Sequence, residues 1–205
     1  HVISSNEAFH LPELPKRILI QGGGYIALEF ACIFSGLGSL VTVVYRGDNI
    51  LRGFDDDVRA HVRDEMEKNG ITILTGCTVD RIEKHYDQYT SSLSNGSSIA
   101  SDKVMFAIGR HPAVANLGLE KAGVAINPDN GGIVVNEASQ SSVPHIYAVG
   151  DVTHRFNLTP VAIREGHAFA DTIFGKRAVK VDHIDIPTAV FTQPQVGTVG
   201  VTEAQ

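Results

Sequence analysis

The sequence predicts an α/β protein in which helices flank a parallel sheet. Short runs of consecutive apolar residues, such as Ile18–Ile20, suit strands that are buried on both faces. Longer segments have apolar residues at helical spacing, as Val58, Val62 and Met66 do. The two kinds of segment alternate between Lys16 and Leu74, and this order is typical of a parallel sheet.

The first part of the chain can be divided into strands and helices by this pattern. We expect strands at 16–21, 40–45 and 71–74, and helices at 25–35 and 55–68. Ile26, Phe30 and Ile33 should form the inner face of the first helix, which Gly36 and Gly38 end. Asp55–Asp57 favour the start of the second helix, because acidic groups interact favourably with the positive N-terminal end of the helix dipole.

The remainder of the chain has a different composition. Residues 78–100 are rich in Thr, Ser and Tyr with an Asn95-Gly96 turn, which predicts a β-meander. A helix is expected at 161–174, closed by Gly175, and a connector at 176–186. Strands are expected at 104–108, 133–135, 146–149 and within 187–201.

Composition and charge exclude some classes of protein. The formal net charge of −6 argues against a nucleic-acid binder, and no apolar run reaches the roughly 20 residues that span a bilayer. Cys32 and Cys77 lack the spacing of a redox pair and are expected to be buried, unpaired thiols, which fits a reducing cytoplasm. No metal site is predicted. His1 begins without an initiator Met, so we expect a cut or processed end.

A glycine-rich loop lies between the first predicted strand and helix. Gly22, Gly24 and Ala27 form a G-x-G-x-x-A pattern. The first glycine permits a tight turn, the second lets backbone approach a pyrophosphate, and the small Ala27 lets helix and strand pack closely. Helix N-termini bind anions through free N–H groups. The placement of the loop therefore predicts a Rossmann-like dinucleotide site rather than an ordinary turn.

The residues at the end of the second strand indicate which dinucleotide the site binds. NAD sites of this kind carry an acidic residue there that binds the ribose hydroxyls. Here the position is Tyr45, followed by Arg46 and, after a short loop, Arg52. Guanidinium groups match phosphate oxygens, whereas an acid would repel a 2′-phosphate. The alternative is that both arginines are solvated loop residues, but the missing acid favours NADPH.

Four runs of sequence resemble, in order, motifs of the glutathione reductase family of pyridine nucleotide-disulfide oxidoreductases. They are Gly22–Phe30 (nucleotide signature), Phe106–Pro112 (domain crossover), Ile146–Asp151 (second flavin motif) and Pro187–Gly200 (start of the dimerisation domain). The resemblance implies a three-layer ββα architecture with a partial second domain for FAD. It also implies an NADPH-binding domain at 1–112, half a FAD-binding domain at 113–184 and the start of an interface domain at 185–205.

The family implies roles for particular residues. Tyr25 resembles the aromatic gate over the flavin, with a core tyrosine as the alternative. Glu29 resembles an acid that pairs with a lysine beside the flavin, with a solvated helix residue as the alternative. The residues expected at NADPH are Gly22, Gly23, Gly24, Tyr25, Ile26, Glu29, Arg46, Arg52, Gly109 and Asn157. Those expected at FAD are Arg110, Asp151, Leu158 and Thr159, where Thr159 would cap a helix directed at the flavin.

Other motifs of the family do not occur in this sequence. No C-x-x-x-x-C redox pair, earlier glycine fingerprint or catalytic His-Glu pair is found, so we expect the central fragment of a homodimeric reductase. The implied substrate is a small disulfide, such as glutathione disulfide. Alternatives are a trypanothione, mercuric or dihydrolipoamide enzyme, or a non-catalytic NADPH-binding fragment. A single-Rossmann dehydrogenase is disfavoured, because no Tyr-x-x-x-Lys pair follows the loop.

Overall fold

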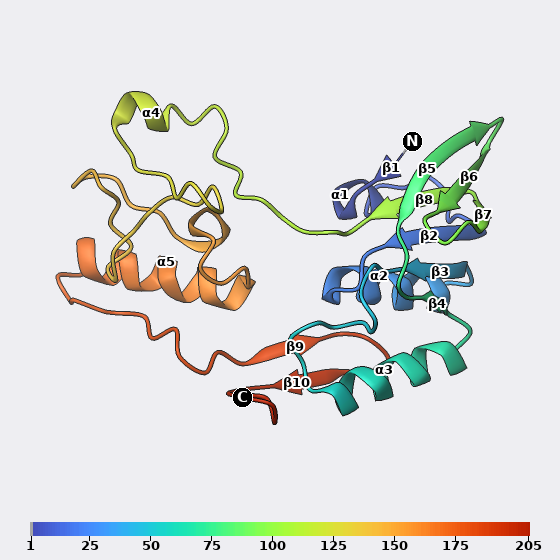
Figure 1. The fold of residues 1–205 in the computed structure, drawn as a ribbon. Helices are drawn as coiled ribbons and strands as arrows, with labels where there is room; N and C mark the ends of the chain where they lie inside the picture. The colour runs from blue at the N-terminus through green and yellow to red at the C-terminus, as the bar shows by residue number, and fades with distance from the viewer. Residues whose placement is uncertain (1) are drawn as a thin grey trace. The chain divides into compact units, whose positions relative to one another are not determined.

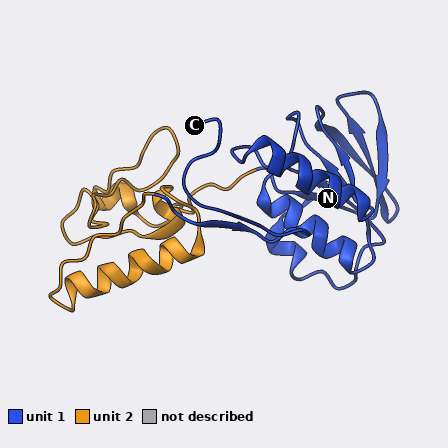
Figure 2. Ribbon diagram, turned by 90° about the horizontal axis from the view of Figure 1, so that it is seen from below, with its two compact units in different colours: residues 1–108, 185–205 blue, residues 109–184 orange. Residues whose placement is uncertain are grey.

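The structure is a computed structural model that describes residues 2–205 and divides into two compact units (Figure 1). The first unit contains the chain up to Ile108 together with Asp185–Gln205, and the second contains Gly109–Ile184. Figure 2 shows that the C-terminal segment belongs to the first unit, although the second unit precedes it in sequence. The functional roles given to these parts of the sequence stay predictions.

A parallel sheet organises the first unit. Its strand order is β1-β8-β2-β3-β4, and each neighbouring pair is parallel. The strands are β1 (Val2–Ile3), β2 (Arg17–Gln21), β3 (Leu40–Val44), β4 (Thr72–Leu74) and β8 (Lys103–Phe106). The strands predicted near 16–21, 40–45, 71–74 and 104–108 are confirmed, and the α/β fold class with them.

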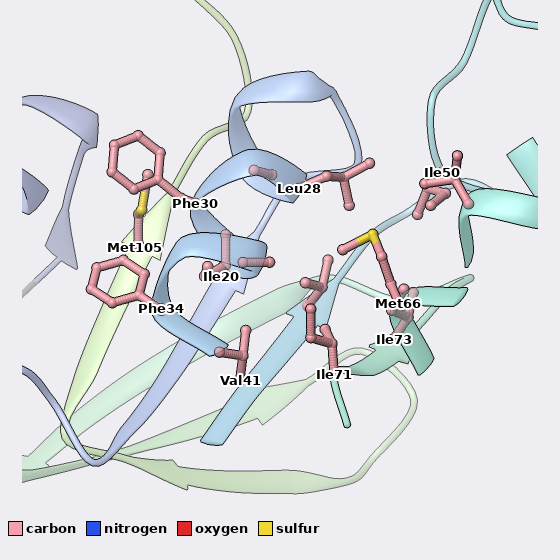
Figure 3. Close-up of a cluster of buried hydrophobic side chains, with 14 of the residues drawn as sticks. Ile20, Leu28, Phe30, Phe34, Val41, Ile50, Met66, Ile71, Ile73 and Met105 are labelled. Carbon is pink, nitrogen blue, oxygen red and sulfur yellow. The ribbon is translucent and has the colours of Figure 1, made fainter. Parts of the chain in front are cut away.

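Helices α2 (Tyr25–Gly36) and α3 (Asp56–Lys68) cover one face of this sheet. Figure 3 shows Phe30 and Phe34 of α2 on the side of Met105, and Leu28 on the side of Ile50, all in the same core as Met66 of α3. The prediction that Ile33 lies inward is wrong, since 48% of its surface is exposed. The buried face instead includes Ala27 and Ala31, whose short side chains allow close approach to the sheet.

The predicted meander covers the opposite face. Strands β5 (Val79–His85), β6 (Gln88–Leu93) and β7 (Ser98–Ser101) form an antiparallel sheet in the order β5-β6-β7. Tyr89 and Leu93 share a buried cluster with Leu19 and Val104 of the parallel sheet. The side chains of Ile18 and Ile20, which alternate with Leu19, lie in the core beneath the helices. The three layers are therefore antiparallel sheet, parallel sheet and helices, as the ββα prediction requires.

Strands β9 (Thr188–Val190) and β10 (Val196–Thr198) form a hairpin against the helical side of the first unit. Val190 is fully buried in the main core, and the N–H of Phe191 donates to Glu29 Oε1 at 2.9 Å. Both cysteines are free, as predicted, but Cys32 is half-buried rather than buried. Burial raises the pKa of both thiols, so neither resembles a reactive thiolate.

The second unit contains helix α4 (Leu119–Ala122), the 3₁₀ turn η1 (Gly150–Thr153) and helix α5 (Thr159–Ile173). The predicted strands at 133–135 and 146–149 are wrong. Residues there make isolated bridges, Ile126 to Ile133 and Gln140 to Tyr147. Ile133 and Ala148 are buried in a small cluster, which explains the apolar pattern, but the described chain pairs them too briefly to form strands.

Candidate functional site

The glycine loop lies at the carboxyl edge of the parallel sheet, directly after β2. A Cβ on Gly22 would lie 2.4 Å from the carbonyl oxygen of Ala107, and one on Gly23 would lie 2.4 Å from the ring of Tyr45. A side chain at either position would displace one of these neighbours. Gly24 has open space around it and is the N-cap of α2. Gly22 and Gly23 therefore allow close packing against their neighbours, and Gly24 leaves the surface of the loop open.

The N-terminus of α2 has unused backbone donors. Its first helical bond runs from the N–H of Leu28 to the carbonyl of Gly24, and no side chain caps the helix within the described residues. The N–H groups of Tyr25, Ile26 and Ala27 precede that bond and have no helical acceptor. An uncapped helix N-terminus after a tight glycine turn suits a pyrophosphate.

The loop after β3 is attached to the glycine loop at two points. The Tyr45 ring lies between Gly23 and Gly47, where a Cβ would come within 2.4 and 2.6 Å of ring carbons. Further along, the N–H of Leu51 donates to the carbonyl of Gly23 at 2.7 Å. Since β2 and β3 are parallel neighbours, both loops leave the same edge of the sheet. The segment 45–52 is therefore fixed beside the predicted nucleotide site.

This attached segment carries both predicted phosphate ligands. Arg46 follows Tyr45 and Arg52 follows Leu51, so each arginine adjoins an anchored residue. Both are exposed, and neither guanidinium makes a hydrogen bond or ion pair with the described residues. Asp48 is the acid of the loop, and it lies apart from the position after β3 that NAD sites use. The structure thus brings together the glycine loop and two free cations.

Tyr25 and Glu29 lie one turn apart on α2. Tyr25 is 36% exposed and belongs to no hydrophobic core cluster, which argues against a core tyrosine. Glu29 Oε1 accepts the N–H of Phe191, a partner that sequence reasoning did not foresee. Ile26 packs against the core, so its free backbone N–H is the group available to a ligand.

In the second unit, the predicted flavin residues lie around η1 and the N-terminus of α5. Asp151 is exposed on η1, next to the buried Gly150. The prediction that Thr159 caps α5 is wrong: Leu158, with φ −130° and ψ 129°, is the N-cap, and Thr159 begins the helix. The Thr159 hydroxyl therefore caps nothing, and the buried Oδ1 of Asn157 has no hydrogen-bond partner within the described chain. These free groups fit a polar ligand.

Gly109 and Arg110 lie at the start of the second unit. Arg110 borders a cavity of about 360 Å³ together with His111, Asp129 and His154. Gly109 and Asn157, which were predicted to bind NADPH, belong to this unit and not to that of the glycine loop. The other residues predicted to bind NADPH belong to the glycine loop, α2 and the segment 45–52 of the first unit.

Sequence reasoning missed two charged residues that support the predicted sites. Arg59 of α3 donates from Nε to the carbonyl of Ile50 and from a terminal nitrogen to that of Asn49, at 2.7 and 3.0 Å. Glu165 of α5 is 1% exposed. A signal for Glu165 existed, because it occupies the same helical stripe as Val161 and Ala168.

Two broader features are absent from residues 2–205. No helix there is long and apolar enough to cross a membrane. Nor does that part of the chain contain a group of three or more His, Cys, Asp or Glu side chains placed to hold a metal ion.

Comparison with known proteins identifies the class that this fold and site define. Residues 1–166 match the pyridine nucleotide-disulphide oxidoreductase family. The match covers most of the chain, and the chain therefore belongs to this family. The resemblance inferred from the four motifs is confirmed.

Individual members of the family are similar to this chain over its whole length. The chain is 51% identical over 204 residues to a glutathione reductase of Burkholderia cepacia, covering 100% of this chain and 45% of the relative. It is 46% identical over 209 residues to a trypanothione reductase of Trypanosoma congolense, covering 100% of this chain and 42% of the relative. Among solved structures, the HOCl-induced flavoprotein disulfide reductase RclA from Escherichia coli matches with TM-score 0.92 and 32% identity, covering 100% of this chain and 47% of RclA. The chain thus spans less than half the length of these relatives.

Proposed function

We propose that this chain is the central part of an NADPH-dependent, FAD-containing disulfide reductase and that it carries the NADPH site. The observation that carries the proposal is the segment 45–52, which is attached to the glycine loop and bears two exposed, unpartnered arginines. In this proposal the glycine loop and the N-terminus of α2 bind the pyrophosphate. Arg46 and Arg52 bind the 2′-phosphate, which NADH lacks.

Removing both arginines tests the cofactor assignment. A charge-assisted hydrogen bond contributes about 1.5–3 kcal/mol, and about 1.4 kcal/mol changes an affinity tenfold. The double variant Arg46→Ala, Arg52→Ala should therefore bind NADPH at least about tenfold more weakly, with the Kd of NADH nearly unchanged. Arg81→Ala, which removes an exposed arginine of β5, is the matched control. Equal losses for NADH and NADPH would show that the arginines do not read the phosphate.

The second unit contains groups that fit FAD. In the proposal, the exposed carboxylate of Asp151 accepts a ribitol hydroxyl, and the uncapped N-terminus of α5 with Thr159 faces the electron-accepting ring. Arg110 and Leu158 border the same ligand, as the family resemblance implies. When bound, FAD supplies the relay for electrons between nicotinamide and a disulfide.

Tyr25 is proposed to cover the flavin and to move when nicotinamide enters. Its partial exposure and its place outside the core leave the ring free to move. In the full-length flavoprotein, Tyr25→Ala should change flavin fluorescence and its response to NADPH while the melting temperature stays nearly constant. Tyr86, which is 98% exposed at the turn between β5 and β6 of the same unit, offers a matched control through Tyr86→Ala. A large fall in melting temperature of the Tyr25 variant with unchanged flavin signals would contradict the gate.

The substrate is proposed to be a small disulfide, with glutathione disulfide preferred. Relatives named glutathione reductase are 51% and 49% identical to the chain, whereas the trypanothione reductase of Trypanosoma congolense is 46% identical. We propose a cytoplasmic homodimer for the full-length protein. Comparing kcat/KM for glutathione disulfide and trypanothione disulfide decides between the two substrates. Absence of turnover with any disulfide, despite bound FAD and NADPH, would favour a non-catalytic nucleotide-binding protein.

A further inference from the structure

A carboxylate is enclosed in the second unit beside the predicted flavin motif. Glu165, in the middle of α5, is 1% exposed. The proposed transfer of electrons does not use it, and none of the assigned ligand contacts involves it. Glutamates are seldom buried to this extent unless partners offset the charge.

Three donors surround this carboxylate. Oε1 accepts a terminal nitrogen of Arg155 at 2.8 Å and Nε2 of His183 at 2.7 Å, and Oε2 accepts the backbone N–H of Gly150 at 2.7 Å. His183 also stacks on Phe156, with ring centroids 5.6 Å apart and planes 10° from parallel. Glu165 therefore connects α5, η1, the loop after η1 and the connector that ends the unit.

The bond to Gly150 fixes the turn that carries Asp151. Gly150 has φ +71°, and a Cβ there would lie 2.9 Å from Cβ of Ala162, so η1 is in close contact with α5. On its other side, the carbonyl of Gly150 accepts the Thr153 hydroxyl at 2.8 Å, and that of Val152 accepts the N–H of Ile133 at 2.8 Å. The backbone of η1 is therefore held on both sides of Asp151, while Asp151 itself is exposed.

Stability does not by itself account for a charge at this position. Replacing a buried ion pair by apolar residues of similar volume is often neutral or stabilising. A leucine at position 165 could fill the space, but it could not accept the N–H of Gly150. Apart from the ion pair with Arg155, an oxygen here is needed by the hydrogen bond from His183 and by the connection to η1, and of these the connection to η1 reaches the turn that carries Asp151.

We propose that Glu165 is a positioning residue that holds Asp151 in place for its ribitol hydroxyl, through the N–H of Gly150. Arg155 offsets the charge, and the hydrogen bonds from Arg155 and His183 orient the carboxylate. This inference rests on the proposed function, since it takes Asp151 as a ligand of FAD. It assigns to Glu165 no contact with the flavin.

Two paired variants of the full-length flavoprotein, each also carrying His183→Phe so that this second donor is absent from both, isolate the bond to Gly150. Both remove the arginine: Glu165→Leu, Arg155→Leu lacks an acceptor at position 165, whereas Glu165→Gln, Arg155→Leu retains one of similar size. We expect the leucine pair to bind FAD at least about tenfold more weakly than the glutamine pair. The Kd of FAD is measured by fluorescence quenching as FAD rebinds to apoprotein. Melting of the apoprotein and the Kd of NADPH are measured alongside.

A double-mutant cycle separates positioning from general support of the fold. Asp151→Asn should weaken the binding of FAD strongly in the wild type and much less in the leucine pair, because the carboxylate of Asp151 is already displaced in the leucine pair. Glu137→Gln, at an exposed ion pair with Lys180 in the same unit, is the control and should leave the Kd of FAD unchanged. If the leucine pair does not fold, Glu165→Asp, which keeps the charge but withdraws it from Gly150, should weaken FAD in the same way.

The outcomes distinguish this inference from the proposed function. If Asp151→Asn weakens FAD but the leucine and glutamine pairs bind it equally, Glu165 is not a positioning residue and the flavin site stands. Additive effects in the cycle would likewise overturn the inference. If Asp151→Asn leaves the Kd of FAD unchanged, the assignment of Asp151 fails, and the inference fails with it.

Discussion

Arg59 shows how a residue without an assigned ligand contact can control a site. Its guanidinium donates to the carbonyls of Asn49 and Ile50 and pairs with Asp56 of the same helix. These carbonyls belong to the segment that carries Arg46 and Arg52. The segment is thus held by the glycine loop on one side and by α3 on the other.

Removing the donors of Arg59 should lower the preference for NADPH. Arg59→Met keeps a long side chain but loses both bonds to the loop, so Arg46 and Arg52 should become less well ordered. Two hydrogen bonds of about 0.5–1.5 kcal/mol each predict that the Kd of NADPH rises by roughly tenfold. The Kd of NADH should change little, and calorimetric titration of both nucleotides measures the ratio. Arg63→Met, which removes a pair with Glu67 on the same helix, should leave the ratio intact. An equal rise in the Kd of NADPH and of NADH would mean that Arg59 supports the fold and does not contribute to the preference for NADPH.

These residues mark the limit of what sequence can predict about the site. Arg46 and Arg52 could be found because local order places them after a strand that follows a glycine loop. Arg59 could not, because its partners are backbone carbonyls nine and ten positions away that only the fold brings close. The network of Glu165 depends on contacts 10 to 18 residues distant, and only the apolar stripe around it hinted at burial.

At the scale of elements, one ion pair joins the start of β2 to the turn before β8. Asp102 accepts the backbone N–H of Arg17 at 2.9 Å and its guanidinium at 2.7 Å, and its own N–H donates to the carbonyl of Arg17 at 2.9 Å. The hydrogen bond with the Arg17 side chain lowers the pKa of Asp102 below its ordinary value. The pair therefore fixes the register of two central strands.

This pair predicts a pH-dependent contribution to stability. A lowered carboxyl pKa stabilises the fold above the unfolded-state value of about 3.9, and the contribution is lost as pH falls through the lower folded-state value. Asp102→Asn should therefore melt a few degrees below the wild type at pH 7. The gap should close in the acid range below about pH 4. Asp80→Asn, at an exposed site on β5, is the control for a lost surface charge. A gap that is the same at pH 3 and pH 7 would contradict the charge-based explanation.

The elements themselves differ in how far sequence can predict them. The strands of the parallel sheet and the helices α2 and α3 were predictable, because periodicity and end signals agree along each segment. Ile33 was misplaced because the buried face of α2 runs through Ala27, Phe30, Ala31 and Phe34, and Ile33 lies outside it. Residues 133–135 and 146–149 are apolar enough for strands, but a strand also needs a partner that sequence pattern does not reveal.

For the molecule as a whole, the C-terminal segment returns to the first unit. Glu29 of α2 accepts the N–H of Phe191, and Asp55, before α3, accepts the N–H of Glu203 at 2.6 Å. Together with the buried Val190, these bonds attach the C-terminal segment to the helical side of the first unit. The second unit has a smaller buried cluster around Val124, Ile133 and Ala148. Its helix α5 exposes Ile163 and Ile173, with Phe174 directly after it.

This difference predicts how a polypeptide of these 205 residues behaves on its own. The first unit contains the glycine loop and the arginine segment, so the polypeptide should bind NADPH weakly or moderately. FAD requires a glycine loop for its own pyrophosphate, and the sequence offers a single fingerprint, at Gly22. The exposed apolar residues of the second unit should also promote aggregation. Purified with excess FAD, the polypeptide should be colourless and should not oxidise NADPH with glutathione disulfide. The double variant Arg46→Ala, Arg52→Ala of the same polypeptide controls for non-specific nucleotide binding. A yellow protein with stoichiometric flavin, or measurable turnover, would show that these residues form a complete flavin site by themselves.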